Sequence, residues 1–209
     1  MIAPLGGVVF DMDGVLCRYR LDARLAYLSG LSGRGAAEIR EAIWGSGFED
    51  RADAGELSAE AYLAGFGERI GVALTRGQWV AARRAAMSPD PAMLALVRRL
   101  GARLPVALLT NNGFLLRETL PELAPELPPL FGDRLFVAAE LGARKPEVAV
   151  YQRVAARLAL PPGALLMVDD NAANAAGAVA AGWQGHQFSG MEGLLARLAE
   201  LGITVGGPE

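Results

Sequence analysis

The sequence has very few of the side chains that bind transition metals or serve as thiol and imidazole catalysts. Among its 209 residues, Cys17 is the only cysteine and His186 the only histidine. A single cysteine excludes a disulfide within the chain, and together the two residues are too few for a Cys/His zinc cluster. His186 is the only possible base of a Ser-His-Asp triad, and no serine near it stands in a Gly-x-Ser-x-Gly turn. Thiol, zinc and serine-triad chemistry are therefore not indicated.

Lysine is almost as rare. Lys145 is the only lysine among 20 basic residues, and all the others are arginine. The chain is also rich in alanine, and this bias indicates GC-rich coding, which turns lysine into arginine unless a site needs an ammonium group. The formal net charge of -3 excludes a broad basic surface, so we expect no nucleic-acid partner.

Long apolar runs are also missing. No stretch approaches the roughly 18 residues that a membrane span needs. Residues 1–5 carry no basic side chain, and the apolar run after them ends at Asp11, which differs from a secretory signal peptide. We therefore expect a cytoplasmic protein without a membrane partner. Hydrophobic residues make up 52% of the chain and charged residues 21%, which excludes a disordered chain. The length fits one domain of roughly 150 residues with a large insertion, or two small domains.

Short apolar runs that end in polar residues are what the sequence does contain. They have no polar alternation, as expected for parallel strands that are buried on both faces. Helical patterns lie between them, and several end at glycine. This alternation predicts an α/β fold, a Rossmann-like doubly wound parallel sheet. The expected strands are residues 8–10, 106–109, 135–138, 165–168 and a weaker 185–188, and the expected helices are 91–100, 146–158, 172–181 and 191–201.

A helical region separates the first strand from the rest of the sheet. Four helical patterns are expected there, at residues 21–28, 36–44, 58–70 and 76–87. Ser58 and Thr75 are suitable N-caps, and Thr75 with Gln78 forms a capping box. About 75 residues is too long for a strand crossover, so we expect an inserted helical subdomain. The predicted division is a core of residues 1–15 and 90–209, and an insertion of residues 16–89.

The polar residues that end the strands are candidates for a site. In open α/β sheets, ligands bind outside the carboxyl ends of the strands. Carboxylates packed there repel one another and favour a divalent cation, and an all-oxygen shell suits Mg²⁺. Lys145, before the helix that follows the third strand, can counter the charge of a phosphate. The strand-end residues are Asp11, Asp13, Thr110, Asn111, Asp169 and Asp170.

The pair Asp11 and Asp13 suits phosphoryl transfer. A carboxylate can attack a phosphoryl group to give an aspartyl-phosphate. A second carboxyl two residues away can protonate the leaving alkoxide and later deprotonate the attacking water. In an extended strand, side chains at i and i+2 point the same way. Thr110 and the neighbouring amides can hold a phosphate oxygen.

Four segments in this order resemble the motifs of phosphatases of the haloacid dehalogenase (HAD) superfamily. The resemblance covers nearly the whole chain, and the insertion after the first motif is similar to the C1 cap of that family. The segments are Asp11-Met12-Asp13-Gly14-Val15-Leu16, Leu109-Thr110-Asn111, Lys145-Pro146 with Tyr151, and Val168-Asp169-Asp170-Asn171 with Asn174 and Gly182.

The resemblance implies catalytic and substrate-binding roles for these positions. Asp11 would be the nucleophile and Asp13 the general acid/base. Thr110 and Lys145 would bind the phosphoryl group, with Asn111 nearby. Haloacid dehalogenases lack the second aspartate of the first motif, so Asp13 favours phosphate over halide chemistry.

The resemblance also implies a magnesium site. Asp11 and Asp170 would bind the metal through their side chains, and Asp13 through its backbone carbonyl. Asp169 would either reach the metal through water or orient Lys145, and the sequence leaves both open.

The insertion carries a finer resemblance. Phe48-Glu49, residues 54–58 and Tyr62 resemble the cap segment of small sugar-phosphate phosphatases, a subgroup that includes α-glucose-1-phosphate phosphatase. Arg18 lies where the chain leaves the site for the insertion and is a further candidate for binding substrate.

The expected function is Mg²⁺-dependent hydrolysis of a small phosphorylated metabolite, and alternatives remain open. A phosphomutase uses the same motifs but protects its aspartyl-phosphate from water. A phospho-receiver domain also combines acids, a threonine and a Lys-Pro pair, but has no paired acids after the lysine, where this chain has Asp169 and Asp170. A dehalogenase is a third option.

Overall fold

A five-stranded parallel sheet forms the centre of the molecule. The structure, a computed structural model, describes residues 4–204. The strand order is β5-β4-β1-β6-β7, and every neighbouring pair is parallel. The α/β fold with a doubly wound parallel sheet is therefore confirmed, including the weak last strand. The strands are β1 (Gly7–Phe10), β4 (Val106–Thr110), β5 (Leu135–Val137), β6 (Leu165–Asp169) and β7 (Gln184–Gln187).

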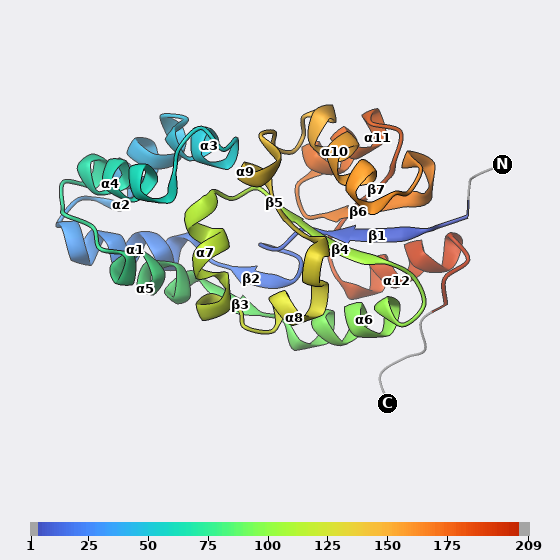
Figure 1. Cartoon of the computed structure of the whole chain (residues 1–209). Helices are drawn as coiled ribbons and strands as arrows, with labels where there is room; N and C mark the ends of the chain where they lie inside the picture. Colours follow the sequence, from blue (N-terminus) through green and yellow to red (C-terminus); the bar gives the residue numbers. More distant parts are fainter. Residues whose placement is uncertain (1–3, 205–209) are drawn as a thin grey trace.

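Helices cover both faces of this sheet (Figure 1). Helices α10 (Val148–Leu158) and α11 (Ala172–Ala180) lie on one face, and α6 (Pro91–Gly101) and α12 (Met191–Glu200) on the other. Successive strand residues enter different cores. Val8 and Phe10 pack with the cluster that includes the α6 and α12 side chains, whereas Val9 packs with the cluster of α10 and α11. Burial on both faces explains why the strand sequences are apolar throughout.

Five α-helices between Tyr19 and Met87 form a bundle that we call the helical insertion. All four expected helical patterns are present, and the side chains of Ser58 and Thr75 cap their helices as expected. The second pattern ends in a π-helical turn, Glu41–Gly45. The short helix α3 was not expected. The helices are α1 (Leu21–Ser32), α2 (Ala36–Arg40), α3 (Phe48–Asp53), α4 (Ala59–Ile70) and α5 (Arg76–Ala86).

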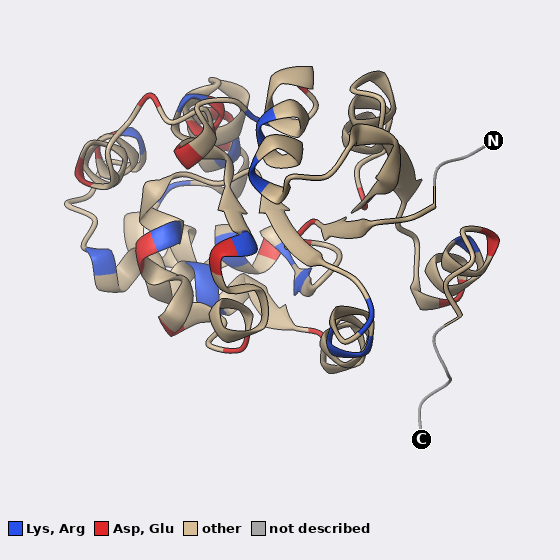
Figure 2. Ribbon diagram, turned by 45° about the vertical axis from the view of Figure 1, so that its right-hand side comes forward, with Lys and Arg blue, Asp and Glu red and all other residues tan. Residues whose placement is uncertain are grey.

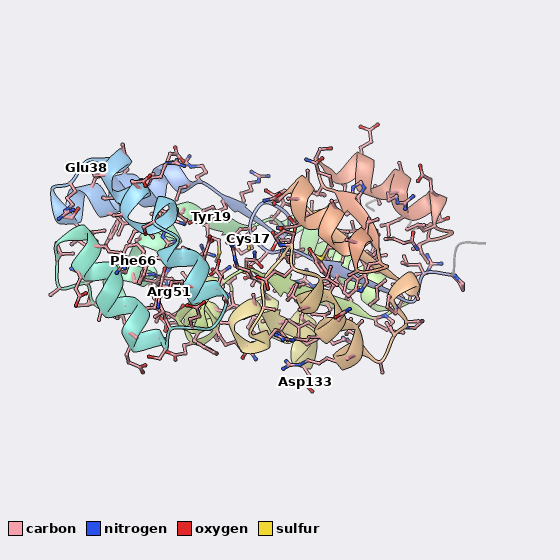
Figure 3. The ribbon with its side chains drawn as sticks, turned by 90° about the horizontal axis from the view of Figure 1, so that it is seen from above. Cys17, Tyr19, Glu38, Arg51, Phe66 and Asp133 are labelled. Carbon is pink, nitrogen blue, oxygen red and sulfur yellow. The ribbon has the colours of Figure 1, made fainter. Side chains whose placement is uncertain are left out.

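A two-stranded antiparallel ribbon joins the insertion to the sheet. Its strands are β2 (Cys17–Tyr19) and β3 (Met87–Pro89). The labelled side chains of Cys17 and Tyr19 lie where the insertion meets the rest of the molecule (Figure 3). Three-residue strands show no alternation in sequence, so this ribbon was not predicted.

The remaining helices lie in the connections that follow β4 and β5. Helix α7 contacts both α4 and α5 and so supports the insertion from the core side. It contains Pro121. The short elements are α7 (Phe114–Leu123), α8 (Leu127–Phe131), α9 (Ala138–Leu141), and 3-10 turns at Gly132–Arg134 and Pro162–Ala164. Within residues 4–204, no helix has the length and apolar character to cross a membrane.

One helix start was predicted wrongly. The proline rule placed the beginning of a helix at Pro146, but α10 begins at Val148 with Glu147 as its N-cap. The amide of Glu147 instead donates to the Arg144 carbonyl at 2.9 Å, so residues 144–147 form a turn. This turn carries Lys145 to the sheet edge.

Candidate active site

The polar residues that end β1, β4 and β6 meet at one edge of the sheet, as expected. Carboxylate oxygens of Asp11, Asp169 and Asp170 lie within 4.8 Å of one another. Asp11 and Asp169 are buried, while Asp170 is exposed. In the ribbon coloured by charge, acidic and basic segments are interleaved where the insertion faces the sheet (Figure 2). The edge therefore combines several carboxylates with a route to solvent at Asp170.

The loop after β1 is held in a tight turn that makes room for Asp170. The Met12 carbonyl accepts hydrogen bonds from the amides of Leu16 (2.9 Å) and Cys17 (2.8 Å). Gly14 has φ +86°, which favours glycine. A Cβ atom at this position would lie 2.2 Å from the Asp170 Oδ2. Gly14 is therefore required both by the backbone and by the neighbouring carboxylate.

Lys145 is buried at the centre of the cluster, with 1% of its side chain exposed. Its Nζ lies 2.8 Å from Asp11 Oδ1 and donates to Asp169 Oδ2 at 2.6 Å and to the Leu109 carbonyl at 3.0 Å. Burial alone would lower the pKa of this ammonium, but Asp11 and Asp169 raise it. All three of its N–H bonds have acceptors, so the ammonium is charged and fixed in place.

Asp169 contacts Lys145 directly, as the second of its two predicted roles requires. Asp169 is fully buried, and both of its carboxylate oxygens are occupied. Oδ1 accepts from the Asn171 amide at 2.9 Å and from the Asn174 side chain at 3.1 Å. Oδ2 accepts from Lys145 and, at 3.2 Å, from Asn174. The carbonyl of Asn174 in turn accepts from the Tyr151 hydroxyl at 2.6 Å.

Several opposing effects set the pKa of the Asp11 carboxyl. Burial raises the pKa of its carboxyl, Lys145 lowers it, and Asp169 raises it again, with a result of about 7. The pKa of Asp170 is also raised, first by burial and then by Asp169. Three carboxylates around one ammonium leave excess negative charge, and a divalent cation bound between Asp11 and Asp170 would favour both ionised forms.

The end of β4 supplies a hydroxyl and a structural amide. Thr110 is buried, and its Oγ1 accepts from the Asn112 side chain at 2.8 Å, which leaves its own proton free to donate. Asn111 was predicted near the substrate, but its side chain is used within the protein. Its Nδ2 donates to the Lys145 carbonyl at 2.8 Å, and its Oδ1 accepts from the Lys145 amide at 2.9 Å. The Asn111 side chain therefore fixes the turn that carries Lys145.

Asp13 is paired with an arginine that the sequence analysis did not single out. Arg83, on α5, donates from Nη2 to Asp13 Oδ2 at 2.5 Å. Arg83 is 3% exposed, and Asp13 Oδ1 is buried without a hydrogen-bond partner among the described residues. Position 83 follows the buried Trp79 by four residues and Val80 by three, so helical periodicity was the signal that could have identified it.

Arg18 is not brought to the carboxylate cluster. Its side chain is 77% exposed and pairs with Asp90 at 3.3 Å, and it lines a hollow of about 390 Å³ with Arg20 and Arg84. Successive side chains of β2 point to opposite sides, and Arg18 lies opposite the buried Cys17.

Comparisons with known proteins identify the family of the chain. The sequence model of haloacid dehalogenase-like hydrolases matches residues 5–182. A predicted HAD-like family hydrolase from Porphyromonas gingivalis is similar in structure, with a TM-score of 0.81, 22% identity, and coverage of 95% of this chain and 98% of that chain.

Two other structures are relevant. A HAD family enzyme from Bacteroides thetaiotaomicron, in complex with magnesium and inorganic phosphate, has a TM-score of 0.76, 18% identity, and coverage of 87% of this chain and 93% of that one. The L-2-haloacid dehalogenase from Xanthobacter autotrophicus has a TM-score of 0.62, 21% identity, and coverage of 96% and 84%. At these identities the structures support the fold, and the sequence match supports the family. The chain belongs to the haloacid dehalogenase-like hydrolase family.

Proposed function

We propose that this hydrolase is a Mg²⁺-dependent phosphatase that acts on a small phosphate monoester, with sugar phosphates as one candidate class because the insertion resembles the cap of a sugar-phosphate subgroup. The observation that carries the proposal is the contact between the Lys145 Nζ and Asp11 Oδ1 at 2.8 Å, with a second carboxyl, Asp13, two residues along. An ammonium beside the nucleophile can neutralise an incoming phosphate, and Asp13 adds the acid/base that ester cleavage needs.

The side chains at the sheet edge suit magnesium. Asp11 and Asp170 would hold the ion, and the Asp13 backbone carbonyl would complete the protein ligands. Their oxygen atoms are hard ligands, and the single positive charge of Lys145 does not balance the negative charge of the carboxylates. Asp169 would act behind this shell, since its oxygens are used by Lys145 and Asn174. When bound, the cation would draw the phosphoryl group to the carboxylates and offset charge on its oxygens.

The proposed reaction has two displacements at phosphorus. In the first, an Asp11 oxygen bonds to phosphorus, the ester bond breaks, and Asp13 gives its proton to the leaving alkoxide. In the second, water attacks the same phosphorus, Asp13 takes a proton from it, and the bond to Asp11 breaks to release phosphate. Lys145 and the Thr110 hydroxyl would hold the phosphoryl oxygens in both steps.

The helical insertion would serve as a cap over this site, with residues 16–89 as the cap and 1–15 and 90–209 as the core. Its helix α3 lies against the loops that end β4 and β5. A Cβ atom at Gly55 would lie 2.4 Å from the Ala139 carbonyl, and one at Gly113 would lie 3.3 Å from the Ala52 carbonyl. Such close approach supports a role in excluding water during transfer.

Asp13 supports phosphate rather than halide chemistry, because an acid/base is needed to cleave an ester and not to displace halide. A phosphomutase remains the alternative that uses the same residues. Release of phosphate without a bisphosphate activator separates the two, since a mutase protects its aspartyl-phosphate from water. A phospho-receiver domain would hold a long-lived phosphoryl group without turnover.

The experiment that tests the proposal is phosphate release from an aryl phosphate, with and without Mg²⁺. We expect turnover that EDTA abolishes and that excess Mg²⁺ restores. Asp11→Asn keeps the shape of the side chain and should reduce turnover to background. Arg98→Gln, on the exposed side of α6, is the matched control and should behave as the unsubstituted protein. Turnover by Asp11→Asn at the unsubstituted rate would refute the mechanism.

A further inference from the structure

Arg83 is a buried cation on the side of the site that the insertion covers. It comes from α5, whereas the carboxylates and Lys145 come from the core. Its Nη2 contacts Asp13, the proposed proton donor to the leaving group, so its guanidinium lies beside the carboxyl that would protonate the leaving alkoxide. Arg83 Nε is buried without a hydrogen-bond partner among the described residues.

A second guanidinium lies in the same region. Arg24, on α1, is 1% exposed, and its Nη1 donates to the Tyr19 hydroxyl at 3.1 Å. The Arg83 guanidinium lies over the Tyr19 ring, 4.8 Å from the ring centroid, so Tyr19 contacts both arginines. Arg24 Nε and Nη2 are also buried without described hydrogen-bond partners, although Glu49 lies 3.9 Å from Nη1.

More aromatic rings lie against Arg24 than against Arg83. The Arg24 guanidinium lies 5.2 Å from the Trp44 ring and 5.4 Å from the Trp79 ring, and these rings stabilise its charge together with Glu49. Among residues 4–204, Arg83 lies over one ring, that of Tyr19, and forms an ion pair with Asp13 alone. Arg83 is therefore the guanidinium that an incoming anion would engage.

We propose that Arg83 binds an anionic group on the leaving-group part of the substrate, so that the preferred substrates are phosphorylated acids, with a carboxylate or second phosphate near the ester. This inference rests on the proposed phosphatase function and adds its substrate class.

The physical reason for this preference is that the buried Arg83 guanidinium needs an anion to balance its charge. During ester cleavage Asp13 must direct a carboxyl oxygen to the leaving alkoxide, and any movement away from Arg83 leaves that charge unpaired. Carboxylates and phosphates match the forked N–H donors of arginine, and such charged hydrogen bonds are roughly twice as strong as those to neutral hydroxyls. A neutral sugar hydroxyl would be a weaker hydrogen-bond partner for the Arg83 guanidinium than the Asp13 carboxylate.

One acidic side chain of the insertion lies near this position and must be considered. Asp53, at the end of α3, is 8% exposed and close enough for its charge to interact with Arg83, but it forms no ion pair among the described residues. Asp13 is thus the carboxylate that pairs with Arg83, and a substrate anion at this position would approach the same guanidinium.

The test compares matched substrates that differ only in charge. We would measure kcat/KM for 2-phosphoglycolate and 2-hydroxyethyl phosphate, and for 3-phosphoglycerate and glycerol 3-phosphate. The unsubstituted protein should prefer the acid of each pair. Arg83→Gln should reduce kcat/KM for the acids roughly 10- to 150-fold more than for the neutral partners, and Arg83→Lys should restore part of the preference. Arg84→Gln, the next residue along α5, is the control and should keep the preference.

The outcomes are separable. If Arg83→Gln reduces both members of a pair equally, Arg83 acts by positioning Asp13 and the inference is wrong. If kcat/KM for the neutral esters equals that for the acids, the inference is also wrong, while the phosphatase function stands. If no phosphate ester is cleaved, the phosphatase function itself fails. Should the variants not fold, inhibition of aryl phosphate hydrolysis by malonate, set against 1,3-propanediol, tests the unsubstituted protein: selective inhibition by malonate supports the inference, and equal effects overturn it.

Discussion

Removal of the Lys145 ammonium is the perturbation with the most clearly defined cost. In Lys145→Met the side chain becomes one atom shorter and loses its charge, and three acceptors lose the Nζ donor: Asp11, Asp169 and the Leu109 carbonyl. Removing one partner of a buried ion pair costs about 3–5 kcal/mol, because the remaining charge stays unpaired. For a domain of this size, that corresponds to a fall in Tm of roughly 6–20 °C.

A double-mutant cycle with Asp169→Asn separates this electrostatic cost from loss of packing. If the Lys145–Asp169 contact is the source, the second substitution removes one of the stranded charges. The double variant should then be more stable than the sum of the single effects by about 1–3 kcal/mol. Chemical denaturation in EDTA gives the free energies of unfolding without a contribution from bound cation. Arg98→Met, an exposed position, should change stability by less than about 0.5 kcal/mol. Additivity of the two single effects would refute the reasoning.

Two other predictions follow from single residues. Gly14→Ala should lower the free energy of unfolding by about 1–3 kcal/mol and weaken Mg²⁺ binding, measured by calorimetry. The reason is that the φ of +86° at position 14 disfavours alanine, and the new Cβ would meet Asp170. Gly30→Ala, at a position with open space around it, is the control and should leave Mg²⁺ binding unchanged. Burial, followed by Glu49, raises the pKa of Asp53 well above its ordinary value of 3.8, so the folded state holds this proton more tightly and stability falls as pH rises above about 4. Asp53→Asn should therefore raise Tm at pH 7 and have no such advantage below pH 4, and a constant difference in Tm across that range would contradict the assignment.

The sheet and most of its site could be predicted from the sequence because the relevant information is local. Val8 and Val9 enter different cores, so β1 must be apolar at every position, and the first polar residue, Asp11, marks the strand end. Parallel strands then bring their carboxyl ends to one edge. The magnesium-type carboxylate group at Asp11, Asp169 and Asp170 follows from that geometry, without knowledge of any contact.

What could not be predicted depends on packing between distant segments. The pairing of Asp13 with Arg83 spans 70 residues and is set by how α5 lies over the loop after β1. Among so many arginines, composition gives no reason to choose this one. The role of Asn111 was missed for the same reason, since its amide groups meet the backbone of Lys145, 34 residues away. Pro146 was misplaced because the rule for helix starts considers only the local chain and not the turn that Asn111 holds.

The position of Lys145 explains why one lysine persists in a chain that otherwise uses arginine. Its Nζ serves three acceptors from β1, β4 and β6 that surround a single buried point. An ammonium donates in three directions from one atom, whereas a guanidinium is planar and would direct its donors away from at least one of these acceptors. The contrast with Arg83 follows the same physics. Arg83 contacts one oxygen of Asp13 from the side of the insertion. Its forked guanidinium would also suit an anionic group of the proposed substrate. In the proposed reaction the two cations would therefore serve different parts of the phosphate ester: Lys145 contacts Asp11, the proposed nucleophile, and Arg83 contacts Asp13, the proposed acid/base.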